Sequence, residues 1–178
     1  METLIKVINM VIVEGVDNSG KTTLARQLAN DLGLLYINNR AKPRSFTDLD
    51  RDTYNFVELA KIYSTIHDRW SPISEAVYGK VIRSAAWHNY EEFIQLYDYA
   101  ARANPLVIYC RPSVKTICSW KEPQMIGVKK MAKELIKEYD ERIDIVGKSL
   151  QVMVYDYEKH DYQKTSSAVL SHLQGAIH

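Results

Sequence analysis

The residues best placed to do chemistry lie in one glycine-rich stretch, residues 14–23, with the sequence EGVDNSGKTT. Its Gly15, Gly20, Lys21 and Thr22 have the spacing of the Walker phosphate-binding loop. The glycines allow backbone amides to turn toward a bound anion, and a helix that begins nearby adds its positive end. Lys21 would reach the β- and γ-phosphates of ATP, and the Thr22 hydroxyl would bind Mg²⁺. The spacing therefore predicts a site for ATP and magnesium.

The remaining residues of this loop complete the predicted nucleotide contacts. Thr23 is available to the α-phosphate, one position beyond the threonine assigned to the metal. An ordinary glycine-rich turn is the alternative interpretation, but the motif lies between a predicted strand and a predicted helix, which is the context it requires. The residues expected to bind the nucleotide cofactor are Gly15, Asn18, Ser19, Gly20, Lys21, Thr22 and Thr23.

Regular elements on both sides must hold this loop in place. Residues 7–13 form an apolar, β-branched run, which is typical of a strand buried on both faces of a parallel sheet. Apolar residues then recur at helical spacing from Lys21 to Leu32, and Gly33 stands where a helix C-cap is expected. Further strands are predicted over residues 34–37, 63–67, 106–110 and 151–155.

Helical periodicity fills the intervals between these strands. A helix is expected from near Asp48, after a loop over residues 38–46, and Pro112 fits the first turn of another helix. Residues 120–128 are polar and contain Pro123 and Gly127, so we interpret them as a mobile connection and a lid candidate. Other helices are predicted over residues 73–85 and 93–100, from 128 to 143, and after the last strand.

The alternation of strands and helices predicts an α/β protein. We expect the three-layer P-loop NTPase fold, with a mostly parallel five-stranded sheet, helices on both faces and a short lid. The length of 178 residues and the hydrophobic fraction of 46% fit a single domain over residues 1–178.

Bulk properties narrow the possible partners. The formal net charge of +1 disfavours extended DNA or RNA as the main partner. No apolar run approaches the roughly 20 residues that span a bilayer, and the N-terminus lacks the pattern of a signal peptide, so we expect a soluble, cytoplasmic protein without membrane contact. A homodimer is compatible with the sequence. Cys110 and Cys118 match no metal or disulfide pattern and are interpreted as small buried apolar residues.

The loop alone does not separate a kinase from a GTPase or a mechanical ATPase. The base-reading and switch motifs of GTPases are absent from the sequence, and mechanical ATPases are generally longer than this chain. Size therefore favours a small-molecule kinase.

The glycine-rich segment together with Asp68-Arg69-Trp70 resembles thymidylate kinases and their deoxynucleoside-kinase relatives. Compact thymidylate-kinase-like proteins encoded by bacteriophages are especially similar. They share the segments that here read DRWSPISEAVYG, residues 68–79, and LVIYCRP, residues 106–112. The likeness runs from about residue 7 to about residue 155.

The resemblance implies roles for three residues. Asp68 would lie near magnesium or the acceptor, Arg69 would grip the acceptor phosphate, and Asp17 would contact a deoxyribose hydroxyl. A guanidinium at that place can also stabilise charge that develops during phosphate transfer. The alternatives are a surface Asp-Arg pair for Asp68 and Arg69 and a turn-forming role for Asp17. Lys21, Asp68 and Arg69 are the predicted catalytic residues, and Thr22 and Asp68 the predicted metal ligands.

The same resemblance extends the acceptor site. Arg40 or Arg44 falls where the family has an acceptor-phosphate arginine, although the usual Arg-Glu-Pro-Gly-Gly sequence is absent. Arg111 follows the carboxyl end of a buried strand and could contact phosphate or form a structural salt bridge. The other predicted acceptor contacts are Trp70 and Tyr78, which could stack on the base, and Ser74; core packing is the alternative for Tyr78.

The predicted lid departs from the family, because the arginines that many thymidylate kinases carry there or inside the loop are missing. Lys121 and Lys129 could neutralise charge, but an ammonium group cannot reproduce bidentate geometry; a solvated helix face is the alternative for Lys129. The family's Tyr-Gln pair is Val77-Tyr78 here, which leaves the acceptor base open.

These observations lead to three functional hypotheses. The first is an ATP-dependent (deoxy)nucleoside monophosphate kinase, with dTMP as the first acceptor to test. The second keeps the phosphate transfer but takes a deoxynucleoside, or a hydroxymethylated base in phage DNA, as the acceptor. The third is a nucleotide-dependent interaction module without catalysis, which the intact motif residues disfavour.

Overall fold

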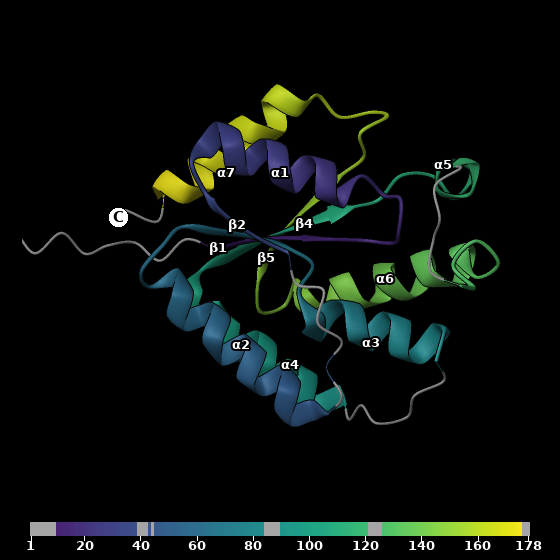
Figure 1. The fold of residues 1–178 in the computed structure, drawn as a ribbon, viewed down its shortest axis with the longest axis horizontal. Helices are drawn as coiled ribbons and strands as arrows, with labels where there is room; N and C mark the ends of the chain where they lie inside the picture. The colour runs from purple at the N-terminus through teal and green to yellow at the C-terminus, as the bar shows by residue number, and fades with distance from the viewer. Residues whose placement is uncertain (1–9, 39–42, 44, 84–89, 121–125, 176–178) are drawn as a thin grey trace, which may run out of the picture.

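The computed structural model describes residues 10–38, 43, 45–83, 90–120 and 126–175. Five parallel strands form one sheet in the order β2-β3-β1-β4-β5, so the strand that leads into the glycine-rich loop lies at the centre (Figure 1). The strands are β1 (Met10–Glu14), β2 (Leu35–Asn38), β3 (Thr65–Asp68), β4 (Pro105–Cys110) and β5 (Gln151–Tyr155). The predicted α/β class and mostly parallel sheet are confirmed.

Helices cover both faces of the sheet. Figure 1 shows α1 and α7 on one face and α2, α3, α4 and α6 on the other. The bounds are α1 (Lys21–Leu32), α2 (Phe46–Ala60), α3 (Ser71–Val81), α4 (Tyr90–Ala100), α5 (Val114–Ser119), α6 (Ala132–Val146) and α7 (Tyr162–Gly175), with a short 3₁₀ helix over Ala101–Ala103.

The pleat of the central strand β1 explains why a hydrophobic core lies on each face of the sheet. Met10 and Ile12 pack into the cluster under α2, α3, α4 and α6, whereas Val11 and Val13 pack into the cluster under α1 and α7. All four side chains are fully buried. Successive side chains of a strand point to opposite faces, so a strand without polar residues at these positions must be covered on both sides.

Local signals set several helix ends. Gly33 closes α1 in a left-handed conformation with φ 64°, as the sequence predicts. Ser45 caps α2 by accepting a hydrogen bond from the Asp48 amide, so this helix begins two residues before Asp48. Pro112 corrects a prediction: it precedes the N-cap residue Ser113 of α5 and lies outside the first helical turn.

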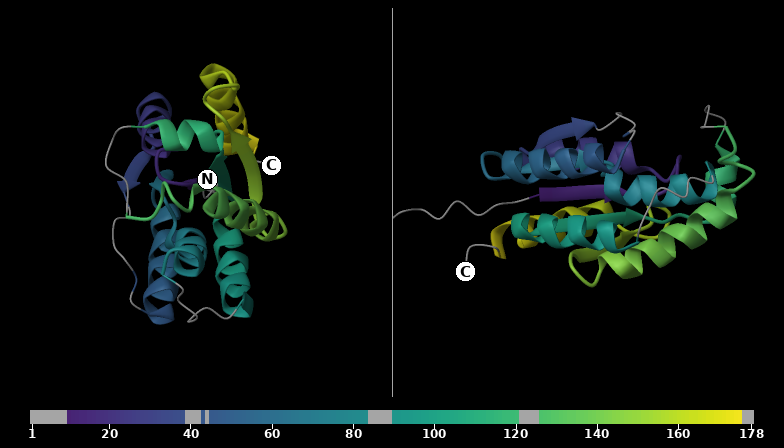
Figure 2. Two further views of the ribbon diagram at one scale, coloured as in Figure 1. Left: turned by 90° about the vertical axis from the view of Figure 1, so that its right-hand side faces the viewer. Right: turned by 90° about the horizontal axis from the view of Figure 1, so that it is seen from below.

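Other boundaries shift by a few residues. The predicted strand over residues 63–67 is β3, which ends at Asp68, and the helix predicted from residue 128 begins at Ala132, after a turn. In the lid candidate, residues 120–128, positions 121–125 lie outside the described residues. Figure 2 (left) looks onto the carboxyl ends of the strands, where α5 lies close to the glycine-rich loop.

Candidate phosphoryl-transfer site

The glycine-rich loop joins β1 to α1 through left-handed backbone positions. Gly15 has φ 143° and Gly20 φ 84°, and Asn18 adopts φ 63° without being glycine. A Cβ on Gly15 would lie 2.4 Å from the Cys110 carbonyl oxygen, so no side chain fits there. The loop therefore crosses close above β4 on its way to the helix, in the strand, loop and helix context that the motif requires.

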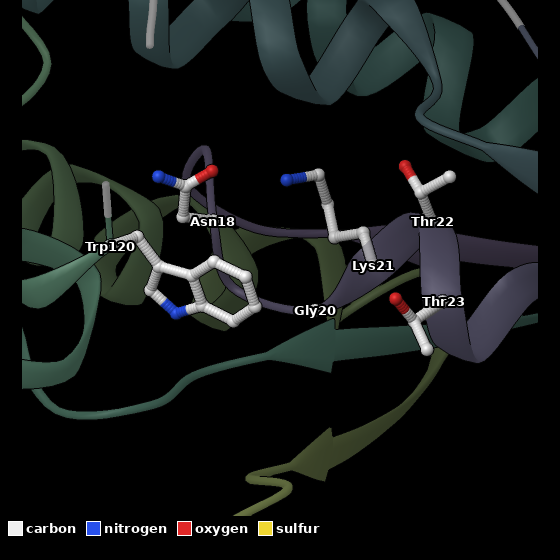
Figure 3. A pocket seen from close by; sticks show the side chains of 6 residues that line it. All are labelled: Asn18, Gly20, Lys21, Thr22, Thr23 and Trp120. Carbon is white, nitrogen blue, oxygen red and sulfur yellow. The ribbon is translucent and has the colours of Figure 1, made fainter. Parts of the chain in front are cut away.

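Lys21 turns its side chain back over the loop. Its Nζ donates a hydrogen bond of 2.6 Å to the Val16 carbonyl oxygen and lies 3.5 Å from Ser19 Oγ. The side chain is buried, and burial together with the positive charge of Arg69 lowers the pKa of Lys21 to about 8. Figure 3 shows the Lys21 ammonium between the side chains of Asn18 and Thr22. A buried ammonium with carbonyl and hydroxyl partners is suited to an anionic ligand.

Thr22 and Asp68 form the predicted metal pair. The Thr22 hydroxyl donates to Asp68 Oδ2 at 2.7 Å, and the Tyr36 hydroxyl donates to the same oxygen at 2.9 Å. Mg²⁺ is commonly held by one or two carboxylates together with water and substrate phosphates, so this hydroxyl and carboxylate fit the ion. No cluster of three or more His, Cys, Asp or Glu side chains that could hold a metal ion occurs in the described part of the chain.

A small pocket lies directly over the loop. Its volume is about 150 Å³, and it is lined by Asn18, Gly20, Lys21, Thr22, Thr23 and Trp120 (Figure 3). Five of these six residues are predicted nucleotide contacts. Trp120, the last residue described before position 126, was not predicted to contribute a contact and was interpreted only as the start of the lid.

Arg69 follows the carboxyl end of β3 and does not belong to the lining of this pocket. It takes up a left-handed conformation with φ 78°, and its amide donates to the Val13 carbonyl oxygen at 3.0 Å. Its guanidinium forms an ion pair with Asp17 and lies over the Tyr78 ring, 5.4 Å from the centroid. Burial acts to raise the pKa of Asp17, but the charges of Arg69 and Lys21 outweigh it and the pKa is lowered.

Three predicted acceptor contacts are buried in this structure. Trp70 is fully buried and packs against Tyr97 with 5.7 Å between ring centroids, so stacking of Trp70 on an acceptor base is corrected to core packing. Tyr78 is 1% exposed and packs in the same core; its hydroxyl accepts from the Asp17 amide and donates to Asp17 Oδ1. The Ser74 hydroxyl is buried and donates to the Trp70 carbonyl oxygen at 3.4 Å.

Glu14 is a buried acid that the sequence analysis quoted in the motif but assigned no role. Its Oε1 accepts from the Trp70 amide at 2.6 Å, and its Oε2 accepts from the Gly15 amide at 3.3 Å and the Tyr139 hydroxyl at 3.1 Å. Burial raises the pKa of Glu14 to about 7, partly offset by the Trp70 amide and Arg69. The carboxyl thereby links the loop, the Asp-Arg-Trp segment and α6. The sequence signal that could have identified Glu14 is an acidic residue at the end of an apolar strand.

Arg111 has the structural role that was the alternative in its prediction. Its Nε and Nη2 each donate to Asp140 at 2.7 Å, and the same carboxylate accepts from the Tyr109 hydroxyl at 3.0 Å. Its amide donates to the Tyr155 carbonyl oxygen. The pair joins β4 to α6, and the prediction of a phosphate contact at Arg111 is not supported by these partners.

The remaining predicted residues are not brought to the site by the described contacts. Arg40, Arg44 and Lys121 lie outside the described residues. Lys129 is exposed in the turn before α6, which matches its alternative interpretation as a solvated residue.

A second pocket adjoins the loop pocket and was missed by the sequence analysis. Its volume is about 320 Å³, and it shares Gly20, Thr23 and Trp120 with the loop pocket. The walls are mostly apolar and aromatic, and their other members are Leu24, Gln27, Tyr155 and Tyr157. The residues come from α1, β5 and three connections, so no local sequence pattern marks them as a group.

Comparison with known proteins finds solved structures with the same fold. No family model and no curated protein sequence matches the chain. The solved structure of YorR protein from Bacillus subtilis, in complex with phosphorylated GDP, has a TM-score of 0.71 at 16% identity, over 93% of this chain and 96% of that one.

Two further solved structures have the same architecture. Deoxyadenosine kinase from M. mycoides, with the products dCMP and a flexible dCDP bound, has a TM-score of 0.60 at 19% identity, over 93% of this chain and 99% of that one. Thymidylate kinase from Candida albicans has a TM-score of 0.59 at 15% identity, over 96% of this chain and 93% of that one. The chain thus has the fold of these P-loop kinases, and none of its described helices is long and apolar enough to cross a membrane.

Proposed function

We propose that this protein is an ATP-dependent (deoxy)nucleoside monophosphate kinase that transfers the γ-phosphate of ATP, with Mg²⁺, to an acceptor such as dTMP. One observation carries the proposal. The Lys21 ammonium, the Thr22 and Asp68 pair, and the Arg69 guanidinium all lie at the carboxyl ends of the adjacent strands β1 and β3. Ligands of open parallel sheets bind at this edge.

The donor phosphates would bind to the loop. On binding, the Lys21 ammonium would exchange its Val16 carbonyl partner for β- and γ-phosphate oxygens, while loop amides and the start of α1 supply further positive potential. Thr22 and Asp68 would hold Mg²⁺, which would neutralise charge on the bridging phosphates. Thr23, exposed beside Thr22, would contact the α-phosphate.

The acceptor phosphate would bind to Arg69. Its guanidinium can pair with a phosphate in bidentate fashion, in place of its present pairing with Asp17. Asp17, released from that pair, would become available to a hydroxyl of the acceptor sugar. Arg40 or Arg44 would add a second cation to the acceptor phosphate, and Lys121 and Lys129 are the lid residues proposed to approach the donor.

Transfer between two phosphates needs positioning more than proton chemistry. An acceptor phosphate oxygen forms the new bond to the γ-phosphorus as the bond from that phosphorus to the β,γ-bridging oxygen breaks, and ADP carries the bonding electrons away. The attacking oxygen is already ionised near neutral pH, so no general base is required. Lys21 and Arg69 would stabilise the charge on the transferring group.

A deoxynucleoside acceptor is the second candidate, because the fold is equally close to deoxyadenosine kinase. An alcohol must lose a proton during transfer, and a base would have to provide for it. Asp68 accepts from two hydroxyls, Asp17 is paired with Arg69, and the buried Glu14 accepts from two amides and the Tyr139 hydroxyl, so all three of these carboxyls are engaged. The phosphate-binding chemistry of Arg69 favours a monophosphate. Modified DNA would require a surface charge that the chain lacks.

The decisive experiment offers the purified protein and [γ-³²P]ATP with Mg²⁺ a panel of deoxynucleoside monophosphates, free deoxynucleosides and hydroxymethylated DNA. Labelled nucleoside diphosphate is the expected product, and dTMP is the first acceptor to test. Label found in nucleosides and not in monophosphates would replace the first candidate by the second. Absence of transfer to every acceptor would refute phosphotransfer as the function.

A further inference from the structure

The larger pocket beside the loop has a shape and lining suited to a flat aromatic ligand. Its volume of about 320 Å³ lies within the range of small-molecule sites, roughly 300–1,000 Å³. Trp120, Tyr155 and Tyr157 are its largest side chains, and Leu24 adds an apolar wall. Such a lining buries apolar surface and offers ring faces for stacking.

The position of the pocket identifies which part of a nucleotide it would receive. The loop pocket receives the phosphates under the proposed function, and Thr23 is assigned to the α-phosphate. Thr23 and Gly20 belong to both pockets. The sugar and base follow the α-phosphate along a nucleoside triphosphate, so the base of the donor would enter the larger pocket.

Trp120 and Tyr157 are bonded to each other through their polar atoms. Trp120 Nε1 donates a hydrogen bond to the Tyr157 hydroxyl at 3.2 Å. A Cβ on Gly20 would lie 3.0 Å from the Tyr157 ring, so the absence of a side chain there lets this ring rest against the loop. The pair thus offers ring surface to a ligand while the Trp120 N–H is already bonded to the Tyr157 hydroxyl.

In the loop that carries Tyr157, several backbone amides that could donate a hydrogen bond to a base are already bonded. The amides of Lys159 and His160 donate to the Asp156 carbonyl oxygen, and the Glu158 amide donates to the Asp156 carboxylate. The Asp156 amide donates to His160 Nδ1. These four backbone amides are therefore bonded within the loop and are not free to donate to the edge of a base.

Gln27 is the carboxamide side chain in the lining. A carboxamide presents a donor on one side and an acceptor on the other and can exchange them by rotation about its last bond. It can therefore meet the amino group of adenine or the carbonyl oxygen of guanine with similar ease. Recognition through Gln27 favours purines without choosing between them.

We infer that the donor base is held by stacking on the Trp120 and Tyr157 pair and is not selected by hydrogen bonds, so that the protein uses ATP and GTP as donors with similar efficiency. This inference deepens the proposed function and rests on it for the placement of the phosphates. Trp120 becomes the residue on which affinity for the donor base depends. Stacking of a base on an aromatic side chain contributes enough that its removal weakens binding roughly 5- to 100-fold.

The test measures equilibrium binding of non-hydrolysable ATP and GTP analogues and of inorganic triphosphate, with Mg²⁺, by calorimetry. We expect the two nucleotide analogues to bind within about tenfold of each other, in line with the absence of a selective hydrogen bond. Trp120→Ala should weaken both analogues and leave triphosphate unchanged, and Trp120→Phe should recover most of the affinity. Gln27→Ala should affect both analogues to the same small extent.

Two results would overturn the inference. One is a preference for either purine greater than about tenfold, which would require a selective hydrogen bond. The other is equal binding of the analogues by wild type and Trp120→Ala, or an equal loss for the analogues and for triphosphate. Circular dichroism of each variant verifies folding, and Trp120→Phe supplies the result if Trp120→Ala fails to fold. Failure of the proposed function is seen separately, as an absence of transfer in the acceptor panel despite these binding results.

Discussion

The two halves of the candidate site differ in how their polar groups are used. We call residues 18–23 together with Trp120 the donor half of the candidate site. Its Thr22 and Thr23 side chains are exposed, and two pockets adjoin the loop. In the acceptor half, Asp17, Arg69 and Tyr78 are bonded to one another. Under the proposed function, a triphosphate would meet an open pocket and displace one carbonyl partner of Lys21, whereas an acceptor phosphate would have to break the ion pair between Arg69 and Asp17. A single substitution in the donor half should therefore lower activity more than a single substitution in the acceptor half.

The largest effect is expected from the donor half. Lys21→Met removes the ammonium that would neutralise the transferring phosphate, so kcat should fall roughly 10²- to 10³-fold. Steady-state transfer from ATP to the best acceptor of the panel measures the loss. Lys137→Met, an exposed lysine on α6, serves as the matched control. A similar loss in both variants would argue against a specific role for Lys21.

Arg69→Ala should impair use of the acceptor without impairing binding of the donor. Without the guanidinium, kcat/KM for the monophosphate should fall roughly 100-fold, because a desolvated charge pair is lost, while binding of a non-hydrolysable ATP analogue should stay near the wild-type value. Arg111→Ala, whose side chain is paired with Asp140, should keep the wild-type KM for the acceptor. Parallel losses of acceptor use and donor binding in Arg69→Ala would contradict its assignment to the acceptor half.

Glu14→Gln tests the carboxyl that joins the glycine-rich loop to the Asp68-Arg69-Trp70 segment. Because burial raises the pKa of Glu14 to about 7 in the folded protein, Glu14 favours folding most below pH 4.5 and loses that contribution as the pH rises through 7. The free energy of unfolding of wild type relative to Glu14→Gln should therefore decrease by about 2 kcal/mol between pH 5 and pH 8. Urea unfolding at both pH values measures it, and a pH-independent difference would contradict this role.

The smallest effect concerns the metal. Thr22→Ala removes the hydroxyl that bridges to Asp68, so the Mg²⁺ concentration for half-maximal activity should rise about tenfold, the value of one hydrogen bond to a charged group. Thr22→Ser should restore it, and Thr23→Ala, one position along the same helix, should leave it unchanged. If Thr23→Ala raises the Mg²⁺ requirement as much as Thr22→Ala, the metal assignment is wrong.

The sequence predicted the glycine-rich loop between a strand and a helix because the signals for it are local. The spacing of Gly20, Lys21 and Thr22, directly after an apolar strand and before a periodic helix, fixes which backbone and side-chain groups can face one anion. The five strands were found for the same reason, since each is a short apolar run bounded by turn residues. Pro112 shows the limit of this approach, because a proline is compatible with both the first helical turn and the residues before the cap.

The surroundings of Trp70 and the pocket between Trp120 and Tyr157 were decided by tertiary contacts. Trp70 looked available for stacking because it follows Arg69, yet packing against Tyr97 buries it. Tyr157 and Trp120 are 37 residues apart and meet through one hydrogen bond.

By itself the sequence determined the parallel α/β fold and the phosphate-binding loop, because apolar periodicity and glycine spacing act over neighbouring residues. Only the folded chain decided which distant side chains share a partner. Asp17 pairs with Arg69, Asp68 with Thr22, and Glu14 with the Trp70 amide. The physical reason is that burial forces each polar group to find a partner in space, and separation along the chain carries no information about that choice.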